Sequence, residues 1–309
     1  MPVTYQNISR HTTNVINDPD ISSEIWAKAL ESSFFMSHAR RITLPGAGVK
    51  IQTVTGEPAA NWVEETNPKP VSTHTLGSKT ITPYKLAVIE PFSTEFVRDK
   101  RALYDELVRR LPTALAAKFD STIMSSSAPG SGFDVLGSCT KVSLIPGSGD
   151  TVYTQFLAAD AAIAAGDGIM TNIGVSPSGK SLIMGAVDGL GHPLFTSGVS
   201  TRDLGNILGA TVEVNKRLYV AGTAASGATA GTPAIVGVAG DFDDAIYAIV
   251  EDVSIEFSRE ATLTWNDGSD HVINLWQQNM IACKAEVSLG FAVKSTDEFV
   301  LLTGATPSA

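Results

Sequence analysis

The sequence predicts an α+β fold, because helical and extended patterns each occupy long stretches of the chain. Residues 281–293 alternate apolar and polar side chains with a period of two, which is typical of a strand with one buried face. Residues 94–121 carry an apolar stripe at helical spacing. Residues 49–56 and 78–90 are rich in β-branched side chains and predict two further strands.

The composition limits the kinds of partner the protein can have. The chain has 309 residues, enough for one large domain or two ordinary ones. Its formal net charge of -10 argues against a protein that binds phosphate backbones tightly, since such binding needs clustered Lys and Arg. Only 17% of the residues are charged, which favours surfaces covered by partners rather than by water.

Cysteine content and hydropathy favour a soluble protein made in the cytoplasm. Cys139 and Cys283 are too few for a disulfide framework or a zinc site, and we expect both to be buried thiols. The first 20 residues do not form a signal peptide, and no apolar run approaches the ~20 residues of a membrane span. No membrane association is expected.

The first third of the chain predicts an arm followed by an extended ribbon. Residues 1–20 lack apolar periodicity, and an amphipathic helix is expected within 21–35. The two strands at 49–56 and 78–90 are joined by a long connection, and Pro83 restricts the second strand to an edge or a free ribbon. A two-stranded ribbon is marginal alone in water, so another surface must stabilise it.

The remaining elements follow in a simple order. Ser93 is a plausible N-cap for the helix at 94–121, in which we expect Pro112 to cause a kink or a restart. The further expected elements are a loop at 125–138, a helix within 150–168 closed by Gly166 or Gly168, a strand at 206–216, a flexible loop at 223–233, and strands at 253–257 and 298–303.

The segment GVSPSGKS matches the phosphate-binding pattern G-x-x-x-x-G-K-[ST]. Its defined positions are Gly174, Gly179, Lys180 and Ser181. A P-loop enzyme also needs a magnesium-holding carboxylate after an apolar strand, and Glu251–Asp252 is an imperfect candidate. We expect the match to be non-functional, and a P-loop NTPase remains the alternative from another functional class.

No other pattern predicts catalysis or a bound metal. The histidines are scattered without ligand spacing, at positions 11, 38, 74, 192 and 271. There is no G-x-S-x-G elbow and no identifiable Cys–His pair. We therefore expect a protein that is not an enzyme and that needs no cofactor and no metal.

The succession of segments resembles the major capsid proteins of tailed bacteriophages with the Hong Kong 97-like fold. The resemblance runs in order from about Leu44 to Thr303. The segments that carry it are TLPGAGVKIQTVTGEPAANWVEE, SKTITPYKLAVIEPFSTEFVRD, LPTALAAKFDSTI, NILGATVEVNK, GDFDDAIYAIVEDVSIEFSREAT and KAEVSLGFAVKSTDEFVLLT.

The resemblance implies a division of the chain into four parts. They are an N-terminal arm with a short helix at 1–43, an E-loop ribbon at 44–91, a P-domain at 92–150 and 244–290 with a spine helix at 94–121, and an A-domain of mixed sheet flanked by helices at 151–243 and 291–309.

The same resemblance implies a structural function. The chain would self-assemble into hexamers and pentamers of an icosahedral head shell around double-stranded DNA, in a virion assembled in the host bacterial cytoplasm. Implied partners are identical subunits, a portal protein at one vertex, a separate scaffolding protein, a decoration protein, and packaged DNA without sequence-specific binding. An encapsulin-like nanocompartment shell is the alternative with the same fold.

Intersubunit contacts are expected on the ribbon and the spine helix, because the ribbon needs an external surface and Trp and Arg dominate interface energetics. The candidates are Trp62, Glu64, Glu65, Lys79, Lys85, Arg98, Arg101, Arg109 and Arg110. Some members of the family crosslink an E-loop lysine to an asparagine of a neighbour. Lys69, Lys79 and Lys85 with Asn274 and Asn279 leave this alternative open, although exposed lysines more often form ion pairs.

Overall fold

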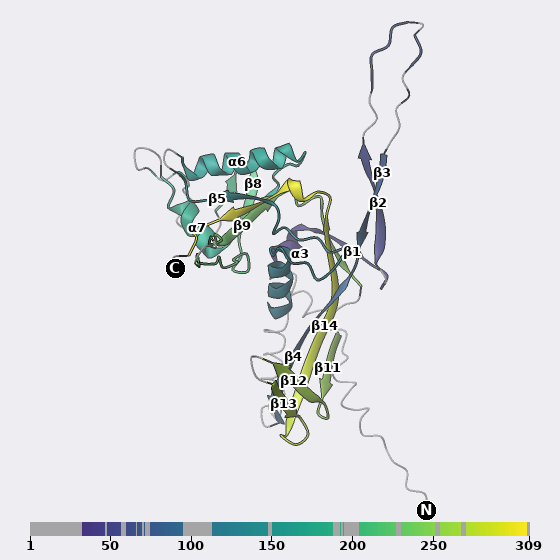
Figure 1. Ribbon diagram of the computed structural model, residues 1–309, viewed down its shortest axis with the longest axis vertical. Coiled ribbons are helices and arrows are strands. Elements are labelled where there is room, and N and C mark those ends of the chain that lie inside the picture. Colours follow the sequence, from purple (N-terminus) through teal and green to yellow (C-terminus); the bar gives the residue numbers. More distant parts are fainter. Residues whose placement is uncertain are drawn as a thin grey trace, which may run out of the picture.

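The structure is a computed structural model (Figure 1). It describes residues 33–46, 48–56, 60–65, 67–69, 71, 75–94, 113–147, 150–187, 192, 194, 204–226, 230–250, 254–266 and 270–307. This part of the chain forms two sheets, a ribbon and a separate hairpin.

The first sheet is built around one long strand. Its strands are β1 (Arg40–Thr43), β4 (Tyr84–Ser93), β10 (Ala245–Ile249), β11 (Ser254–Ser258) and β14 (Met280–Val293). β4 pairs with β14 along one edge over ten positions, while β10 and β11 pair with its other edge. β14 therefore joins strands from two distant parts of the sequence, β4 on one side and β10 with β11 on the other.

The expected burial of one face of β14 is confirmed. The odd-numbered residues from Ile281 to Val293 are buried, while Lys284, Glu286 and Ser288 are partly exposed. From residue 290 to 293 both faces are buried, because Ala292 packs with the base of the ribbon.

A cluster of phenylalanines joins the first sheet to two helices. Residues 113–123 are helical, and α3 (Phe34–His38) is capped by Ser33. Phe35 contacts Phe291 of β14, with ring centroids 5.7 Å apart, and Phe119 contacts the same ring at 6.2 Å. Edge-to-face packing of this kind stabilises a core beyond the area it buries.

The second sheet has the order β5-β15-β9-β6-β8-β7. Its strands are β5 (Thr140–Ser143), β6 (Asn172–Val175), β7 (Asn206–Ile207), β8 (Ala210–Val214), β9 (Ile235–Gly240) and β15 (Phe299–Thr303). The helices α6 (Val152–Ala165) and α7 (Pro177–Met184) share one hydrophobic core with this sheet. The expected end of α6 is confirmed, since Gly166 is its C-cap.

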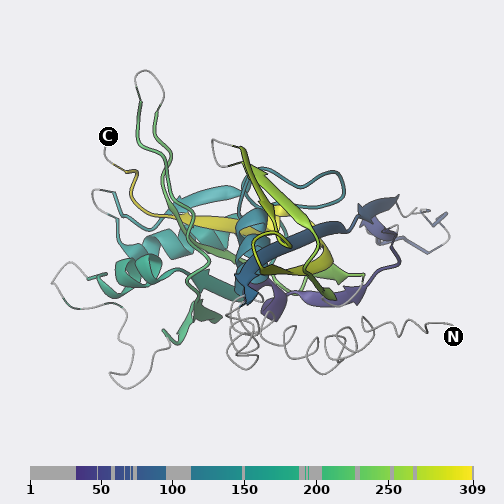
Figure 2. The same cartoon turned by 90° about the horizontal axis from the view of Figure 1, so that it is seen from below.

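Two pairs of strands extend beyond the sheets. The ribbon consists of β2 (Val49–Gly56) and β3 (Thr75–Ile81), which pair only with each other among the described strands. The hairpin consists of β12 (Thr262–Asn266) and β13 (Asp270–Asn274). The ribbon and the hairpin lie at opposite ends of the described body, and Figure 2 shows the ribbon and the helices of the second sheet on opposite sides.

The single strand expected at 78–90 is wrong, because two strands occupy this region. β3 ends at Ile81 and β4 begins at Tyr84, and β4 belongs to the β14 sheet rather than to the ribbon. Thr82 donates its N–H to the Gly132 carbonyl at 2.9 Å, outside the ribbon ladder, and Pro83 has no N–H to donate. The chain therefore changes sheets at these two residues.

Two other expectations are corrected by turn geometry. The strand expected at 206–216 is a tight hairpin of β7 and β8, because Leu208 and Gly209 both have positive φ, at 51° and 88°. The loop expected at 223–233 has paired arms, since Thr223 and Thr232 exchange backbone hydrogen bonds of 3.1 and 2.9 Å.

Several expectations lie wholly or partly outside the described residues. They are the arm at 1–20, most of the helix at 21–35 and the residues 95–112 that include Pro112. The described residues begin at 33, and α3 begins at Phe34, at the end of the range expected for the first helix. The helix expected to end at 121 continues to 123.

Candidate functional site

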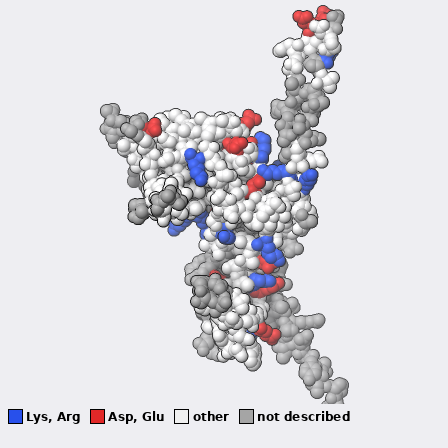
Figure 3. Space-filling view, viewed as in Figure 1, with Lys and Arg blue, Asp and Glu red and all other residues white. Residues whose placement is uncertain are grey.

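The tip of the ribbon presents an aromatic side chain and carboxylates to solvent. Trp62 is 106% exposed, and Glu64 and Glu65 are also exposed. Val71, which is 91% exposed, adds an apolar side chain to the same connection. Figure 3 shows acidic side chains at this tip and basic ones near the base of the ribbon. The structure thus groups three of the predicted contact residues on a surface that is uncovered in the single subunit.

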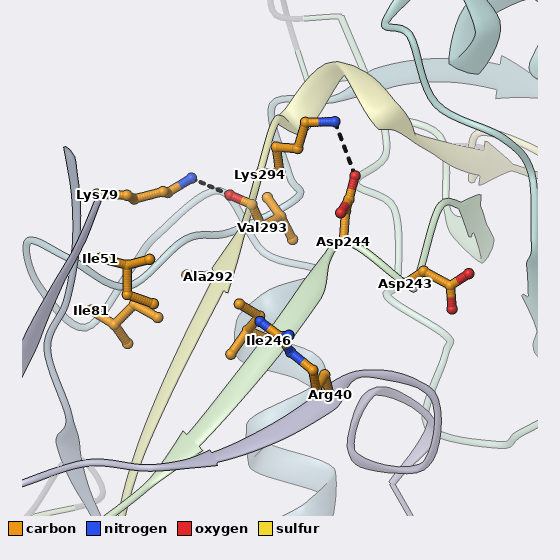
Figure 4. A pocket seen from close by; sticks show the side chains of 10 residues that line it. All are labelled: Arg40, Ile51, Lys79, Ile81, Asp243, Asp244, Ile246, Ala292, Val293 and Lys294. Atoms are coloured by element: carbon orange, nitrogen blue, oxygen red, sulfur yellow. Dashed lines mark hydrogen bonds and ion pairs between the residues drawn. The ribbon is translucent and has the colours of Figure 1, made fainter. Parts of the chain in front are cut away.

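A charged anchor fixes the base of the ribbon to the first sheet. Lys79 of β3 forms an ion pair with Asp134, with Nζ 2.6 Å from Oδ2, and also donates a hydrogen bond to the Val293 carbonyl. The N–H of Val293 donates to the same carboxylate at 2.9 Å. One lysine therefore connects the ribbon to β14, as Figure 4 shows, and through Asp134 to the loop that follows the 113–123 helix.

An apolar contact adds to this anchor. Ile81 packs with Leu44, Ala248 and Ala292 at the base of the ribbon. Beside it lies an open cleft of about 220 Å³, drawn in Figure 4. Its lining residues are Arg40, Ile51, Lys79, Ile81, Asp243, Asp244, Ile246, Ala292, Val293 and Lys294.

A second ion-pair group lies at the junction of the two sheets. Lys294, which follows β14, is 3.1 Å from Asp244 and 3.2 Å from Glu298. Glu298 is buried, and burial raises the pKa of its carboxyl above the ordinary value while Lys294 opposes that shift. The group ties together two of the connections through which the chain passes between the sheets, residues 241–244 and 294–298.

Lys85 lies on β4 and not on the ribbon where it was expected. Its ammonium pairs with Glu286 of the neighbouring strand β14. This hydrogen bond from Lys85 is the main cause that lowers the pKa of Glu286, and Lys284 lowers it further. Two of the lysines considered for crosslinking, Lys79 and Lys85, therefore already have partners within the chain.

The spine-helix arginines Arg98, Arg101, Arg109 and Arg110 lie outside the described residues. Glu251 and Asp252, the carboxylates that the nucleotide hypothesis needs, also lie outside the described residues. The arrangement of GVSPSGKS itself is described completely.

The GVSPSGKS segment contains no phosphate-binding loop. β6 ends at Val175 and α7 begins at Pro177, so Ser176 alone joins the strand to the helix. The Ser176 hydroxyl accepts the N–H of Gly179 at 3.2 Å, which uses a donor that a phosphate would need.

The two glycines of this segment allow close packing. A Cβ on Gly174 would lie 2.5 Å from Leu218 Cδ1, and a Cβ on Gly179 would lie 2.7 Å from the Val236 carbonyl oxygen. Ser181 donates its hydroxyl to the Pro177 carbonyl at 3.1 Å, within its own helix. This geometry supports the prediction that the motif match is non-functional.

Metal ligands do not gather in the described part of the chain. Within those ranges no group of three or more His, Cys, Asp or Glu side chains is placed to bind a metal ion. His38 instead lies 3.4 Å from Glu213 and stacks near Phe34.

Sequence reasoning missed the partners of the lysines and the buried acid Asp120. Asp120 belongs to the 113–123 helix and accepts hydrogen bonds from the Ser33 hydroxyl at 2.5 Å and from the Phe34 N–H at 3.2 Å. Burial is the main cause that raises its pKa to about 7. The only sequence signal was an acid at the edge of an apolar helical stripe, which does not identify a partner 87 residues away.

A body of two sheets with a projecting ribbon fits the Hong Kong 97-like capsid class. A sequence profile of the phage capsid family matches residues 14–304, and the chain belongs to that family. The expected resemblance to tailed-phage major capsid proteins and the expected α+β fold are both confirmed.

Individual relatives agree with this assignment. The chain is 28% identical over 302 residues to "Probable major capsid protein gp17" of Mycobacterium phage L5, covering 93% of this chain and 88% of that protein. A solved structure from Gordonia phage Cozz is similar in fold, with a TM-score of 0.68, 16% identity and coverage of 89% of this chain and 87% of that one.

A third similar chain comes from a structure described as "Capsid of empty GTA particle computed with C5 symmetry". Its TM-score is 0.60 at 14% identity, and the match covers 89% of this chain and 90% of that one. At this level of identity the likeness shows the fold alone.

Proposed function

We propose that this protein is the major subunit of the icosahedral head shell of a tailed phage, where it forms hexamers and pentamers around packaged double-stranded DNA. The observation that carries the proposal is the ribbon. It pairs only with itself among the described strands, its described ion pair lies at its base, and its tip exposes Trp62 completely. Such a ribbon needs a surface outside its own subunit.

In this proposal the ribbon of one copy lies across its neighbour. The contact is head-to-tail, so repeated copies close into rings, and rings of five and six can use the same surfaces. Trp62 would bury its ring there, while Glu64 and Glu65 would face basic side chains. The predicted spine-helix residues Arg98, Arg101, Arg109 and Arg110 are suitable partners for these carboxylates.

The division into arm, E-loop, P-domain and A-domain is part of the proposal. The β14 sheet with the 113–123 helix corresponds to the P-domain, and the second sheet with α6 and α7 corresponds to the A-domain. The pairing of β4 with β14 favours an E-loop that ends near residue 81 rather than 91.

Further partners follow from the shell proposal. They are a portal protein at one vertex, a separate scaffolding protein, a decoration protein, and DNA that is enclosed without sequence-specific contact. The net charge of -10 suits a wall that contains DNA without binding it tightly. Assembly would take place in the cytoplasm of the host.

Electron microscopy of the purified chain and of native particles tests the proposal. We expect closed shells, tubes or capsomer rings, with DNA inside particles from the native source. A cargo enzyme inside them would instead indicate an encapsulin-like compartment. Small particles that do not associate at high concentration would contradict the shell function, and micromolar ATP binding lost in Lys180→Ala would favour the nucleotide hypothesis.

The role of the ribbon tip has its own test. Trp62→Ala should lower the yield of assembled particles by about tenfold or more, as truncation of an interface aromatic does. It should leave the unfolding temperature of the free subunit unchanged, because the side chain is fully exposed there. Asn61→Ala, at the adjacent exposed position, is the matched control. Equal yields for the two variants would show that the tip makes no important contact.

A further inference from the structure

The helix α6 exposes apolar side chains on the side opposite its buried face, beside the polar Thr154. Its inner face, Val152, Phe156, Ala159 and Ile163, belongs to the core of the second sheet. Its outer face carries Tyr153 and Leu157, each 42% exposed, and Ile169 just beyond the helix is 75% exposed. The remaining exposed apolar positions of the helix are Ala158, Ala161, Ala164 and Ala165.

This outer face exposes more apolar surface to water than is usual for a surface helix. A surface helix normally has a polar outer face, and a helix that is apolar all round is normally buried. Asp160 is the single charged residue among the 14 residues of α6. The helix is also shorter than the ~20 residues of a membrane span. Among the described helices, none is long and apolar enough to cross a bilayer.

The place of α6 in the molecule suggests what covers it. In Figure 1 the helix lies along the upper edge of the second sheet as drawn, and Figure 2 shows the ribbon on the opposite side of the molecule. Figure 3 shows few charged side chains along this edge. A neighbour that covers α6 would therefore lie on the side of the subunit away from the ribbon.

We propose that a second copy of this chain covers the α6 outer face, which we define as Tyr153, Leu157, Ala161 and Ile169, in the assembled shell. The proposal rests on the shell function proposed above. It commits to a copy because the chain belongs to the phage capsid family and the shell function proposed above is assembly from identical subunits. The exposed alanines let the surface of that neighbour approach the helix closely.

The same subunit also offers a complementary surface. Met184, Val187 and Leu194, at and beyond the end of α7, are exposed apolar side chains of the same domain. Two different apolar surfaces on one domain suit a head-to-tail contact, which closes into rings. We expect the α6 outer face of one copy to meet the surface beyond α7 of the next.

Thiol labelling tests whether α6 is covered. In Ala161→Cys, the new thiol lies on the exposed side of α6, while Cys139 and Cys283 are buried and burial raises the pKa of both to about 12. Iodoacetamide should modify the new thiol readily in free subunits and about tenfold or more slowly in shells assembled from the purified chain. Only another copy can cover the helix in such shells. Equal labelling rates would overturn the proposal.

A charge on the same face gives an independent result. Leu157→Arg should reduce assembly about tenfold or more, whereas Leu157→Met should assemble like the unsubstituted protein. Both variants should unfold at similar temperatures, because Arg and Met are good helix formers and the position is partly exposed. Normal shells from Leu157→Arg would contradict the α6 contact alone. Absence of any assembly by the unsubstituted chain would contradict the shell function itself.

Discussion

At the scale of single residues, folding alters the acidity of Asp120. Its carboxyl lies beneath the N-terminus of α3 and receives hydrogen bonds from Ser33 and Phe34. Burial outweighs these bonds and the attraction of Arg217, and it raises the pKa of Asp120 from 3.8 to about 7. The folded state therefore retains a proton that the unfolded chain releases at lower pH.

This difference predicts how stability depends on pH. Between pH 4 and 7 the folded state binds the proton and the unfolded state does not, so the contribution of Asp120 to stability falls as pH rises and is constant above pH 7. Asp120→Asn should remove up to about 1.4 kcal/mol per pH unit of this dependence. Urea unfolding of free subunits at several pH values measures it.

Other acids also titrate in this range. The informative quantity is therefore the difference in free energy of unfolding between Asp120→Asn and the unsubstituted protein at each pH. Asp243→Asn, which removes a carboxyl group at an exposed position, is the matched control. Parallel curves for the unsubstituted protein and Asp120→Asn would show that Asp120 is not the responsible group.

At the scale of elements, the ribbon depends on the anchor that Lys79 makes. The side chain connects β3 to Asp134 and to Val293, and both partners of the ion pair are about two-thirds or more buried. Lys79→Met should cost about 1 kcal/mol and increase hydrogen exchange at the base of the ribbon about fivefold, while β14 beyond this contact stays protected. Exchange measured by mass spectrometry on free subunits reports both regions.

Lys50→Met is the matched control for this prediction. Lys50 lies on β2 of the same ribbon and is exposed, and its replacement by Met removes the same charge. We expect its exchange pattern to match that of the unsubstituted protein. If Lys79→Met also exchanges normally, the apolar contact around Ile81 is sufficient to fix the ribbon.

The sequence predicted those elements whose patterns are local. The alternation along β14 and the cap of α6 by Gly166 are examples, since both depend on neighbouring residues. The break at Thr82–Pro83 was missed because it depends on β4 finding a partner some two hundred residues away. For the candidate site, the exposed Trp62 was predictable from a polar, proline-rich connection. Lys79 was singled out, but its partner Asp134 follows only from the fold.

At the scale of the whole molecule, β15 joins two hydrophobic cores. Leu301 points into the core that contains the phenylalanine cluster, and the adjacent Leu302 points into the core beneath α6. Both side chains are completely buried. The strand is continuous, and its neighbours β5 and β9 pair with it on either side.

We therefore expect the free subunit to unfold as one unit. Leu301→Ala and Leu302→Ala should each destabilise it by about 2–5 kcal/mol, and each should lower the temperature of one common transition. Calorimetry together with near-ultraviolet circular dichroism checks this. Two separate transitions, with Leu302→Ala shifting just one of them, would show that the cores unfold independently.

The antiparallel pairing of β4 with β14 has a mechanical consequence. The ribbon continues into β4 near Tyr84, and the hairpin leads into β14 near Met280, at the opposite end of the ten-position ladder. A pull that separates the ribbon from the hairpin draws the two strands past each other lengthwise. All the hydrogen bonds between them then bear the force together, instead of breaking one after another as in unzipping. The subunit is thus built to resist tension between the ribbon and the hairpin.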